Sequence, residues 1–490
     1  MTEPRPNRSN ANRITGVNRK KAFVDRPRKS RETRPVAERV KDYREVYREP
    51  SEGDIIGQAS RCMDCGIPFC HASGCPLANI IPELNDQVGE GRWKEACDLL
   101  HTTSNFPEFT GRLCPALCEA ACTLGVGFEP VTIRDVELEV VERGWRDGYI
   151  VPRPPEKRTG RKVAVVGSGP AGLVAAQILN WAGHRVTVFE SDDRVGGFLR
   201  YGVPDFKLEK WVIDRRVDLL VQEGIIFETG VNVGEDVSAH YLLEKFDAVC
   251  LCAGSREPRD LPIPGRELKG VYLALEYLGQ SNRRQMGDAV SPEELIDAKG
   301  KVVVILGGGD TGADCVGTAN RQGARKVWQF ELLPEPPRTR TDEMPWPSYP
   351  AILRSSTSHE EGCEQRWSIQ TKEFLGANGA LTGLRACELD WTKDEGGAWR
   401  MQERPGSEFT QEADLVLLAL GFVRPDHDRL LTDLGVEFDA RGNVRIDAGY
   451  MSSVDRVFAA GDVTMGASLI VRAMNAGRQM AEAVKRYLRD

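Results

Sequence analysis

The cysteines of this sequence are concentrated in one short region, and their spacing is typical of a metal centre. Seven of the thirteen cysteines follow the pattern C-x2-C-x4-C-x4-C-P and then C-P-x2-C-x3-C. They are Cys62, Cys65, Cys70, Cys75, Cys114, Cys118 and Cys122. A close C-x2-C pair can hold one edge of a metal centre, and a later cysteine from another loop can complete it.

Three interpretations of these cysteines compete. They are buried thiols that cluster by chance, two zinc sites with His71 or His101 as an eighth ligand, or two iron–sulfur clusters. A cysteine followed by proline that binds the other cluster also occurs in bacterial two-cluster ferredoxins. Seven thiolates are one fewer than two four-cysteine clusters need, so one ligand is missing, is not cysteine, or is water. Because zinc carries no electrons and the downstream sequence indicates a flavin site, we expect two iron–sulfur clusters.

A glycine-rich turn begins the second chemical region, in the stretch KVAVVGSGPAGLVAA. Gly167, Gly169 and Gly172 have the G-x-G-x-x-G spacing, between a short apolar strand and an apolar helix that Pro170 and Ala171 open. In this motif the first glycine makes a tight turn, the second lets the backbone approach a pyrophosphate, and the third allows close packing of helix and strand. The helix N-terminus offers free N–H groups to the phosphates. Glu190 ends the next strand and is placed to accept from a ribose hydroxyl.

Three later residues fit the same dinucleotide site. Gly197 closely follows the acidic strand end and gives the backbone room beside a ligand. Near the end of the chain, the strand RVFAAGD finishes at Gly461 and Asp462, ahead of a helix expected from about Ser468 to Leu488. A carboxylate at this place can bind a ribityl hydroxyl, while the helix N-terminus faces the flavin or its pyrophosphate.

A second glycine-rich turn repeats the pattern in KVVVILGGGDTGADC. Gly307, Gly309 and Gly312 have the same spacing, and Glu331 stands where Glu190 stands in the first unit. An acidic residue there favours the free 2′-hydroxyl of NAD. However, two cations, Arg338 and Arg340, follow within ten residues and could hold the 2′-phosphate of NADPH. The sequence therefore leaves the choice between NADPH and NADH open.

These motifs predict an α/β protein with two nested Rossmann-like dinucleotide-binding domains, preceded by an α-helical iron–sulfur domain. The basic segment at the start has eleven Lys/Arg against three Asp/Glu and is expected to be a flexible arm. We place the domains as follows: a basic arm at 1–35, a helical domain with two [4Fe–4S] clusters at 36–150, an FAD domain at 158–285 and 426–490, and an inserted NAD(P)H domain at 286–425.

Composition excludes several other classes of protein. The net charge of −8 argues against a general nucleic-acid binder. No run of about 18 apolar residues predicts a membrane span, and no apolar signal peptide follows Met1. We therefore expect a cytoplasmic protein that binds neither nucleic acid nor a membrane. No Ser–His–Asp set is apparent, so we assign no catalytic side chain.

The sequence resembles the small (β) subunit of glutamate synthase, NADPH-dependent type. The resemblance rests on CxxCGxPxC, TGRLCPALCEAAC, VAVVGSGPAGLVAA, RVGGFLRYGVPDFKLEK, GGGDTG, SSTSHEEG and AAGD, in that order, and covers nearly the whole chain from about Arg34. The N-terminal half also resembles part of dihydropyrimidine dehydrogenase. The resemblance implies that FAD takes a hydride from NADPH, and that electrons pass through two [4Fe–4S] clusters to a large (α) subunit. That subunit forms glutamate from 2-oxoglutarate and glutamine.

The resemblance also assigns ligands. It implies that one cluster is held by Cys62, Cys65, Cys70 and Cys122, and the other by Cys75, Cys114, Cys118 and a non-cysteine ligand for which Glu137 matches the place. The FAD residues would be Gly167, Gly169, Gly172, Glu190, Gly461 and Asp462. The nicotinamide residues would be Gly307, Gly309, Asp310, Thr311 and Gly312. Alternatives are an NAD(P)H:ferredoxin-type oxidoreductase subunit with another partner, and a non-enzymatic assembly scaffold, which would need damaged fingerprints.

Overall fold

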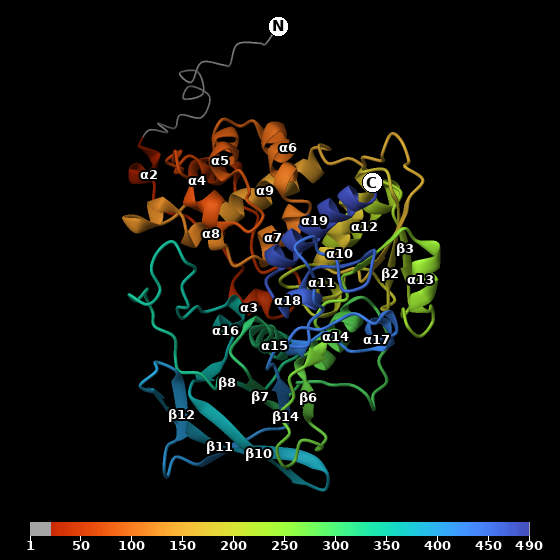
Figure 1. The fold of residues 1–490 in the computed structure, drawn as a ribbon. Helices are drawn as coiled ribbons and strands as arrows, with labels where there is room; N and C mark the ends of the chain where they lie inside the picture. The colour runs from red at the N-terminus through yellow and green to blue at the C-terminus, as the bar shows by residue number, and fades with distance from the viewer. Residues whose placement is uncertain (1–20, 490) are drawn as a thin grey trace.

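A helical domain, a first parallel sheet, a second parallel sheet and an antiparallel sheet follow one another through the molecule (Figure 1). The computed structural model describes residues 21–489. None of the helices within that range is long and apolar enough to cross a bilayer. The predicted α/β class and the two nested dinucleotide-binding units preceded by a helical domain are confirmed.

The helical domain is built from short amphipathic segments around the cysteine loops. Its elements are α2 (Ala22–Asp25), α3 (Val36–Arg39), α4 (Glu52–Ala59), the π-turn η1 (Cys70–Gly74), α5 (Ile81–Gly89), α6 (Trp93–Thr103), α7 (Pro107–Leu113), α8 (Leu117–Ala120), the 3₁₀ turn η2 (Thr123–Val126) and α9 (Ile133–Arg146). Phe106 and Phe109 belong to the same buried core as the flanking helices of the first sheet. The helical domain is thus packed onto the next domain by apolar burial.

The first sheet is parallel, in the order β16-β4-β1-β2-β3. Its strands are β1 (Lys162–Val166), β2 (Arg185–Glu190), β3 (Ile226–Thr229), β4 (Ala248–Leu251) and β16 (Val457–Ala459). Its helices are α10 (Pro170–Trp181), α11 (Phe198–Tyr201), α12 (Lys210–Gln222), α13 (Ala239–Lys245), α17 (Arg429–Leu434), α18 (Asp462–Met465) and α19 (Ile470–Tyr487). The continuous apolar run of β1 is buried because parallel sheets are covered on both faces. The last strand comes from the end of the chain, so the domain is interrupted.

The second sheet, in the order β6-β14-β7-β8-β9, is the interruption. Its elements are β6 (Val271–Leu273), α14 (Ala274–Gln285), β7 (Val302–Leu306), α15 (Asp310–Arg321), β8 (Lys326–Phe330), α16 (Thr357–Glu360), β9 (Glu364–Arg366) and β14 (Leu415–Leu418). Because β6 pairs with β14, the inserted domain begins before the expected boundary at 286. Short strands β5 (Glu257–Pro258) and β15 (Phe422–Arg424) pair where the chain enters and leaves it. The antiparallel sheet of β10 (Ile369–Ala377), β11 (Ala380–Lys393), β12 (Trp399–Glu403) and β13 (Phe409–Glu412) extends from it.

The basic segment at the start differs from the expected flexible arm. Residues 1–20 of that arm lie outside the described residues. From residue 21 onward the segment lies on the helical domain: Arg28 donates to Glu119 Oε2 at 2.6 Å and to the carbonyl of Pro130 at 2.9 Å, and Gln58 donates to the carbonyl of Pro27. The basic side chains find acceptors on helix ends and loops of the domain, which the composition of the segment does not reveal.

Candidate functional site

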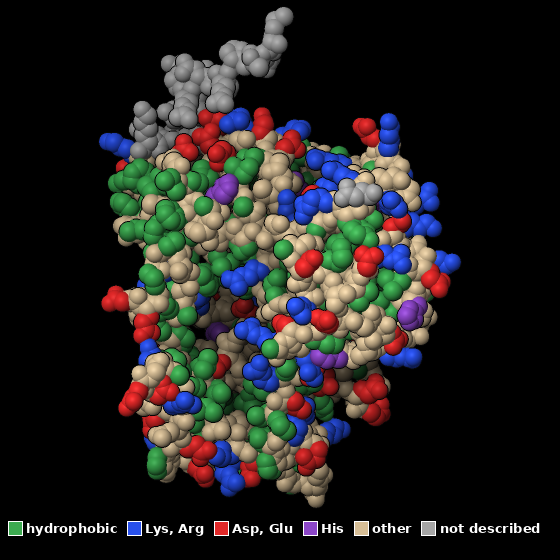
Figure 2. Space-filling view, in the orientation of Figure 1, with side chains coloured by type: hydrophobic (Ala, Val, Ile, Leu, Met, Phe, Trp, Pro, Cys, Tyr) green, Lys and Arg blue, Asp and Glu red, His purple; other side chains and the backbone are tan. Residues whose placement is uncertain are grey.

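One cavity of about 1890 Å³ connects the three parts of the protein. Ligand pockets for one small molecule commonly enclose about 300–1,000 Å³, so this cavity has room for more than one. Both glycine-rich turns line it, and so do residues of the helical domain, among them Cys114 and Arg134. Figure 2 shows the molecule hollowed between its upper and lower parts, with Lys and Arg side chains in the hollow. The cavity thus joins the two predicted dinucleotide sites to the cysteine region.

The first glycine-rich turn has the geometry that its motif predicts. Gly167 has φ +100°, and a Cβ there would stand 2.4 Å from the carbonyl oxygen of Cys252. A Cβ on Gly172 would stand 2.0 Å from the carbonyl oxygen of Gly167. At Gly169, in contrast, a Cβ would meet no atom within 4 Å, and the residue lines the cavity. The first and third glycines are therefore required by the fold itself, while the second leaves open space for a ligand.

The other predicted FAD residues gather around this turn. Pro170, Ala171, Glu190, Gly197 and Asp462 line the cavity. The carboxylate of Glu190 is buried at the end of β2 and accepts from the backbone N–H groups of Ser168 at 3.0 Å and Asp192 at 2.9 Å. Burial raises the pKa of Asp462, whose carboxylate accepts from the hydroxyl of Ser468.

Gly461 serves the backbone and does not line the cavity. Its φ is +82°, and a Cβ there would come within 2.8 Å of the side chain of Ala171. The left-handed region that it occupies favours glycine, and the lack of a side chain lets the end of the chain pack against α10. The position next to Asp462 thus sets where that carboxylate lies.

The second glycine-rich turn reproduces the first. A Cβ on Gly307 would stand 2.2 Å from the carbonyl oxygen of Ala419, and one on Gly312 would stand 2.3 Å from the carbonyl oxygen of Gly307. Nothing lies within 4 Å of a Cβ on Gly309, which lines the cavity together with Asp310, whereas Thr311 is not part of the cavity lining. As in the first unit, the first and third glycines are required by backbone packing, and the second leaves space for a ligand.

Glu331 closes the second unit as Glu190 closes the first. Its carboxylate accepts from the backbone N–H of Gly308 at 2.5 Å and from that of Leu333 at 2.9 Å. The side chain is therefore held at the end of β8, beside the glycine-rich turn. This is the place where an acidic residue meets the adenosine ribose in such folds.

The two arginines suggested as 2′-phosphate ligands do not line the cavity. Arg340 donates to the carbonyls of Met344 at 3.1 Å and Ser348 at 2.6 Å, and to the carbonyl of Ala120 in the helical domain at 3.0 Å. It holds a long loop against the cysteine region, which its sequence distance from Glu331 does not reveal. Arg338 also lies outside the cavity lining, whereas Arg366, on the neighbouring strand β9, is part of it.

A polar cluster of His359 and Gln329, which the sequence did not predict, holds the second glycine-rich turn through a backbone carbonyl. His359 Nε2 lies 2.8 Å from Gln329 Oε1, and Gln329 Nε2 donates to the carbonyl of Gly307 at 2.8 Å. Burial lowers the pKa of His359, and the charge of Lys207 lowers it further. A neutral imidazole can therefore orient the amide that holds the turn. The motif SSTSHEEG, which contains this histidine, was the available signal.

The structure divides the seven cysteines into two groups. Burial raises the pKa of Cys70 to about 12, and the nearby thiols of Cys122, Cys62 and Cys65 raise it further. Burial also raises the pKa of Cys62, and the nearby thiols of Cys122 and Cys65 raise it further. These four residues form the first thiol group: Cys62 and Cys65 lie in the loop before η1, Cys70 is the first residue of η1, and Cys122 directly precedes η2.

The second thiol group contains the remaining three cysteines and one carboxylate. Burial raises the pKa of Cys118 well above its ordinary value, and the nearby Glu137, Glu119, Cys75 and Cys114 contribute to the shift. Burial also raises the pKa of Glu137 to about 7, although Asn79 Nδ2 donates to its carboxylate at 2.8 Å. A carboxylate buried beside three thiols and held by a neutral amide is suited to bind a positive centre.

Cysteine thiols are the common element of the two groups. Cysteine thiolates hold iron–sulfur clusters, and four of them complete one [4Fe–4S] cluster. In residues 21–489 no group of three or more His, Cys, Asp or Glu side chains is arranged to hold a single ion.

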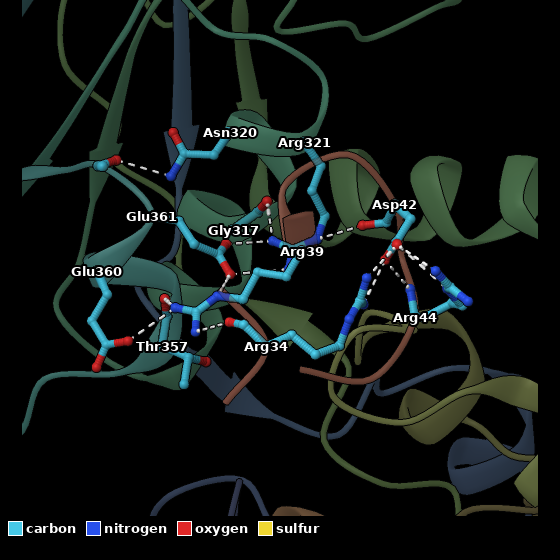
Figure 3. A network of polar contacts seen from close by, with 11 residues as sticks. Arg34, Arg39, Asp42, Arg44, Gly317, Asn320, Arg321, Thr357, Glu360 and Glu361 are labelled. Carbon is cyan, nitrogen blue, oxygen red and sulfur yellow. Dashed lines mark hydrogen bonds and ion pairs between the residues drawn. The ribbon is translucent and has the colours of Figure 1, made fainter. Parts of the chain in front are cut away.

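A buried ion network joins the helical domain to the second sheet (Figure 3). Glu361 accepts from Arg39 Nε at 2.7 Å and from both terminal nitrogens of Arg321, at the end of α15. The three side chains are at most 1% exposed. Arg39 also donates to the carbonyl of Thr357 at 2.7 Å, in the short helix α16 that carries His359. The network therefore sets where α15 and α16 lie beside the cavity.

Replacing Glu361 by Gln is expected to destabilise the protein by about 3–5 kcal/mol, because two buried guanidinium groups lose their shared counter-charge. The matched control is its neighbour Glu360, whose side chain is 51% exposed although it also pairs with Arg39. Glu360→Gln should change stability by less than about 1 kcal/mol. Urea unfolding of both variants provides the measurement. An equal loss of unfolding free energy in the two variants would show that burial of the network does not increase its contribution to stability.

Comparisons with known proteins agree with this architecture. The family described as "Pyridine nucleotide-disulphide oxidoreductase" matches residues 161–479, and the family described as "Dihydroprymidine dehydrogenase domain II, 4Fe-4S cluster" matches residues 39–148. The chain is 55% identical over 464 residues to the glutamate synthase [NADPH] small chain of Mycobacterium tuberculosis (strain H37Rv), covering 94% of both chains. The chain belongs to the glutamate synthase small-chain family. This confirms the resemblance inferred from the motifs and makes the chain an oxidoreductase.

Other relatives show two arrangements of the glutamate synthase family. The glutamate synthase [NADPH] small chain of Bacillus subtilis is 46% identical, with 95% of this chain and 97% of that one covered. The glutamate synthase [NADH] of Schizosaccharomyces pombe is 45% identical over 95% of this chain, yet the match covers only 22% of that longer protein. Among solved structures, M. tuberculosis FprA in complex with NADPH has a TM-score of 0.54 at 19% identity, over 67% of this chain and 85% of that one, which shows the fold alone.

Proposed function

We propose that the chain is the electron-input subunit of a glutamate synthase. In this proposal it oxidises NADPH, with NADH as the alternative, and delivers electrons to a large (α) chain in the cytoplasm. The large chain then forms L-glutamate from 2-oxoglutarate and glutamine. The single observation that carries the proposal is the common cavity, which both glycine-rich turns and Cys114 line. A nucleotide on the second turn, FAD on the first and a cluster at Cys114 would then be neighbours.

In this proposal, residues of the first unit bind FAD and residues of the second unit bind the nicotinamide nucleotide. Gly169 and the N-terminus of α10 would receive the FAD pyrophosphate, with Glu190 at its ribose and Asp462 at its ribityl chain. Gly309 and Glu331 would hold the nicotinamide nucleotide in the corresponding places. When bound, FAD supplies the exchange between a two-electron hydride and single electrons, and the clusters supply one-electron transfer.

The two thiol groups are proposed to hold two [4Fe–4S] clusters. Cys62, Cys65, Cys70 and Cys122 would hold one; Cys75, Cys114, Cys118 and Glu137 would hold the other. The donor sets and the match of residues 39–148 to a 4Fe-4S family support the proposal. The cluster next to the cavity would be the one at Cys114, because no cysteine of the first thiol group lines the cavity.

The experiment that tests the proposal is an anaerobic titration of the purified chain with NADPH and then with NADH. We expect the flavin absorbance to bleach with one nucleotide, iron near eight atoms per chain for two four-iron clusters, and no glutamate formation without the large chain. Zinc in place of iron would contradict the electron-relay proposal. If the chain reduces its flavin and passes electrons to another acceptor protein, but not to a glutamate synthase large chain, the NAD(P)H:ferredoxin-type alternative is favoured.

Glu137 is the least conventional of the proposed ligands, and its replacement tests the second thiol group. Glu137→Ala is expected to disturb the cluster at Cys75, Cys114 and Cys118, lowering iron content or changing its electron paramagnetic resonance spectrum. The control is Glu139→Ala on the same helix, since Glu139 forms an ion pair with Arg146 at 3.2 Å. If iron content and spectrum stay unchanged in the Glu137 variant, the assignment of this ligand is wrong.

A further inference from the structure

An exposed apolar surface surrounds the first thiol group. Its members, here called the apolar patch, are Val24, Met63, Ile67, Val126 and Phe128. Ile67 is 74% exposed and Val126 is 69% exposed. Figure 2 shows hydrophobic side chains gathered at the upper left, over the ends of α2 and α8 in Figure 1. Large apolar side chains scattered singly on a surface are ordinary, but a group of them marks an interaction site.

The patch is assembled by the cysteine loops. Met63 follows Cys62, Ile67 lies between Cys65 and Cys70, and Val126 ends the turn η2, which directly follows Cys122. The segments 65–82 and 120–128 contain no Asp, Glu, Lys or Arg. Side chains from separate segments also meet here: the ring of Phe23 in α2 packs edge-on against Phe128, with centroids 6.1 Å apart. Depletion of charge is typical of the centre of a protein–protein interface.

The patch lies at the far end of the proposed electron route. Cys114 of the second thiol group lines the dinucleotide cavity, but none of the first thiol group does. The two groups are neighbours, because Cys70 and Cys122 of one and Cys118 of the other share a buried cluster. Electrons from the cavity would therefore reach the second thiol group, then the first, and leave through the loops that carry the patch.

We propose that the apolar patch is the surface on which the electron-accepting large chain docks, with its own redox centre facing the first thiol group. This inference rests on the proposed function. The fungal relatives support the choice of occupant: the match to this chain covers only 22% of the S. pombe protein, so there the counterpart of this chain is joined covalently to a much larger region. An apolar surface over the last electron carrier, with no charged residue in the segments that carry Ile67 and Val126, fits a stable complex with such a region.

The test uses the double variant Ile67→Lys/Val126→Lys in the full chain. The matched control is Trp399→Lys/Met401→Lys on β12, where both side chains are at least 50% exposed, on the antiparallel sheet at the opposite end of the molecule. Each is titrated with the large chain encoded by the same genome. We expect the patch variant to raise the Kd more than about tenfold, as charge in an interface centre does. The control variant should bind as the unchanged chain does.

Activities separate this inference from the function on which it rests. The patch variant should keep its iron content and its NADPH oxidation with ferricyanide as acceptor. Its NADPH oxidation with the large chain, 2-oxoglutarate and glutamine should fall at low large-chain concentration and recover near saturation. An unchanged Kd in the patch variant overturns the docking surface alone. Light scattering provides a second check. If the unchanged chain is a dimer, and the variant is a monomer that still binds the large chain, the patch is a contact between copies of this chain and the proposed docking surface is wrong. Absence of ferricyanide activity or of iron in the unchanged protein instead overturns the proposed function.

Discussion

Replacing Cys75 by Ser is expected to lower iron from about eight to about four atoms per chain and to slow electron delivery to the large chain more than about 100-fold, equivalent to about 2.7 kcal/mol of activation free energy. Cys75 lies in the second thiol group, where burial and the nearby Glu137 and Cys114 raise its pKa to about 12. Because this group would stand between the cavity and the first thiol group, its loss interrupts the only route we propose.

Flavin reduction should survive the same replacement. The first glycine-rich turn and Glu190 lie on another domain, so anaerobic bleaching of the flavin by NADPH should keep its rate within about twofold. Cys363→Ser is the control, because that cysteine precedes β9 and belongs to neither thiol group. Loss of flavin reduction in a folded Cys75 variant would show that the two modules are not separable. Full iron content would show that Cys75 is not a ligand.

Alanine at Gly169 is expected to weaken FAD binding more than about 100-fold while leaving the flavin-free protein as stable as before. No atom lies within 4 Å of the added Cβ, and its φ of −68° is accessible to alanine. The methyl group would occupy the space that the pyrophosphate needs. Alanine at Gly172 should instead destabilise the flavin-free protein by about 1–3 kcal/mol, since its Cβ would press on the turn.

Fluorescence titration with FAD and thermal unfolding of the flavin-free variants distinguish the two roles. Gly309→Ala serves as the comparison in the second sheet, where the Cβ also meets open space. That variant should retain FAD and lose affinity for the nicotinamide nucleotide. Normal FAD binding by the Gly169 variant would mean that the pyrophosphate does not lie against this turn.

Local sequence was sufficient to predict those parts of the site whose residues lie close together in the chain. The G-x-G-x-x-G spacing predicted both turns, because the contacts that require glycine are made within one strand–turn–helix unit, as between Gly172 and Gly167. The same reasoning placed Glu190 and Glu331 at strand ends. The interrupted first domain also followed from the sequence, since its last strand and helix lie after the second fingerprint.

Side chains that act across domains were not predictable in this way. Arg340 was expected near a nucleotide phosphate, yet it holds the carbonyl of Ala120 in the helical domain. Arg39 and Glu361 are 322 residues apart and meet in a buried network. Nothing in the local pattern of a charged residue reveals a partner that only the packing of two domains supplies.

The sequence by itself determined the family, the order of the domains and the residues available for cofactors, because spacing, turn chemistry and strand ends are local properties. Only the tertiary structure decided how the parts combine. It brought both glycine-rich turns and Cys114 to one cavity, gathered Glu137 with three thiols, and left the loops of the first thiol group exposed with an apolar surface. These features depend on which surfaces are buried against one another, and burial is a property of the whole fold.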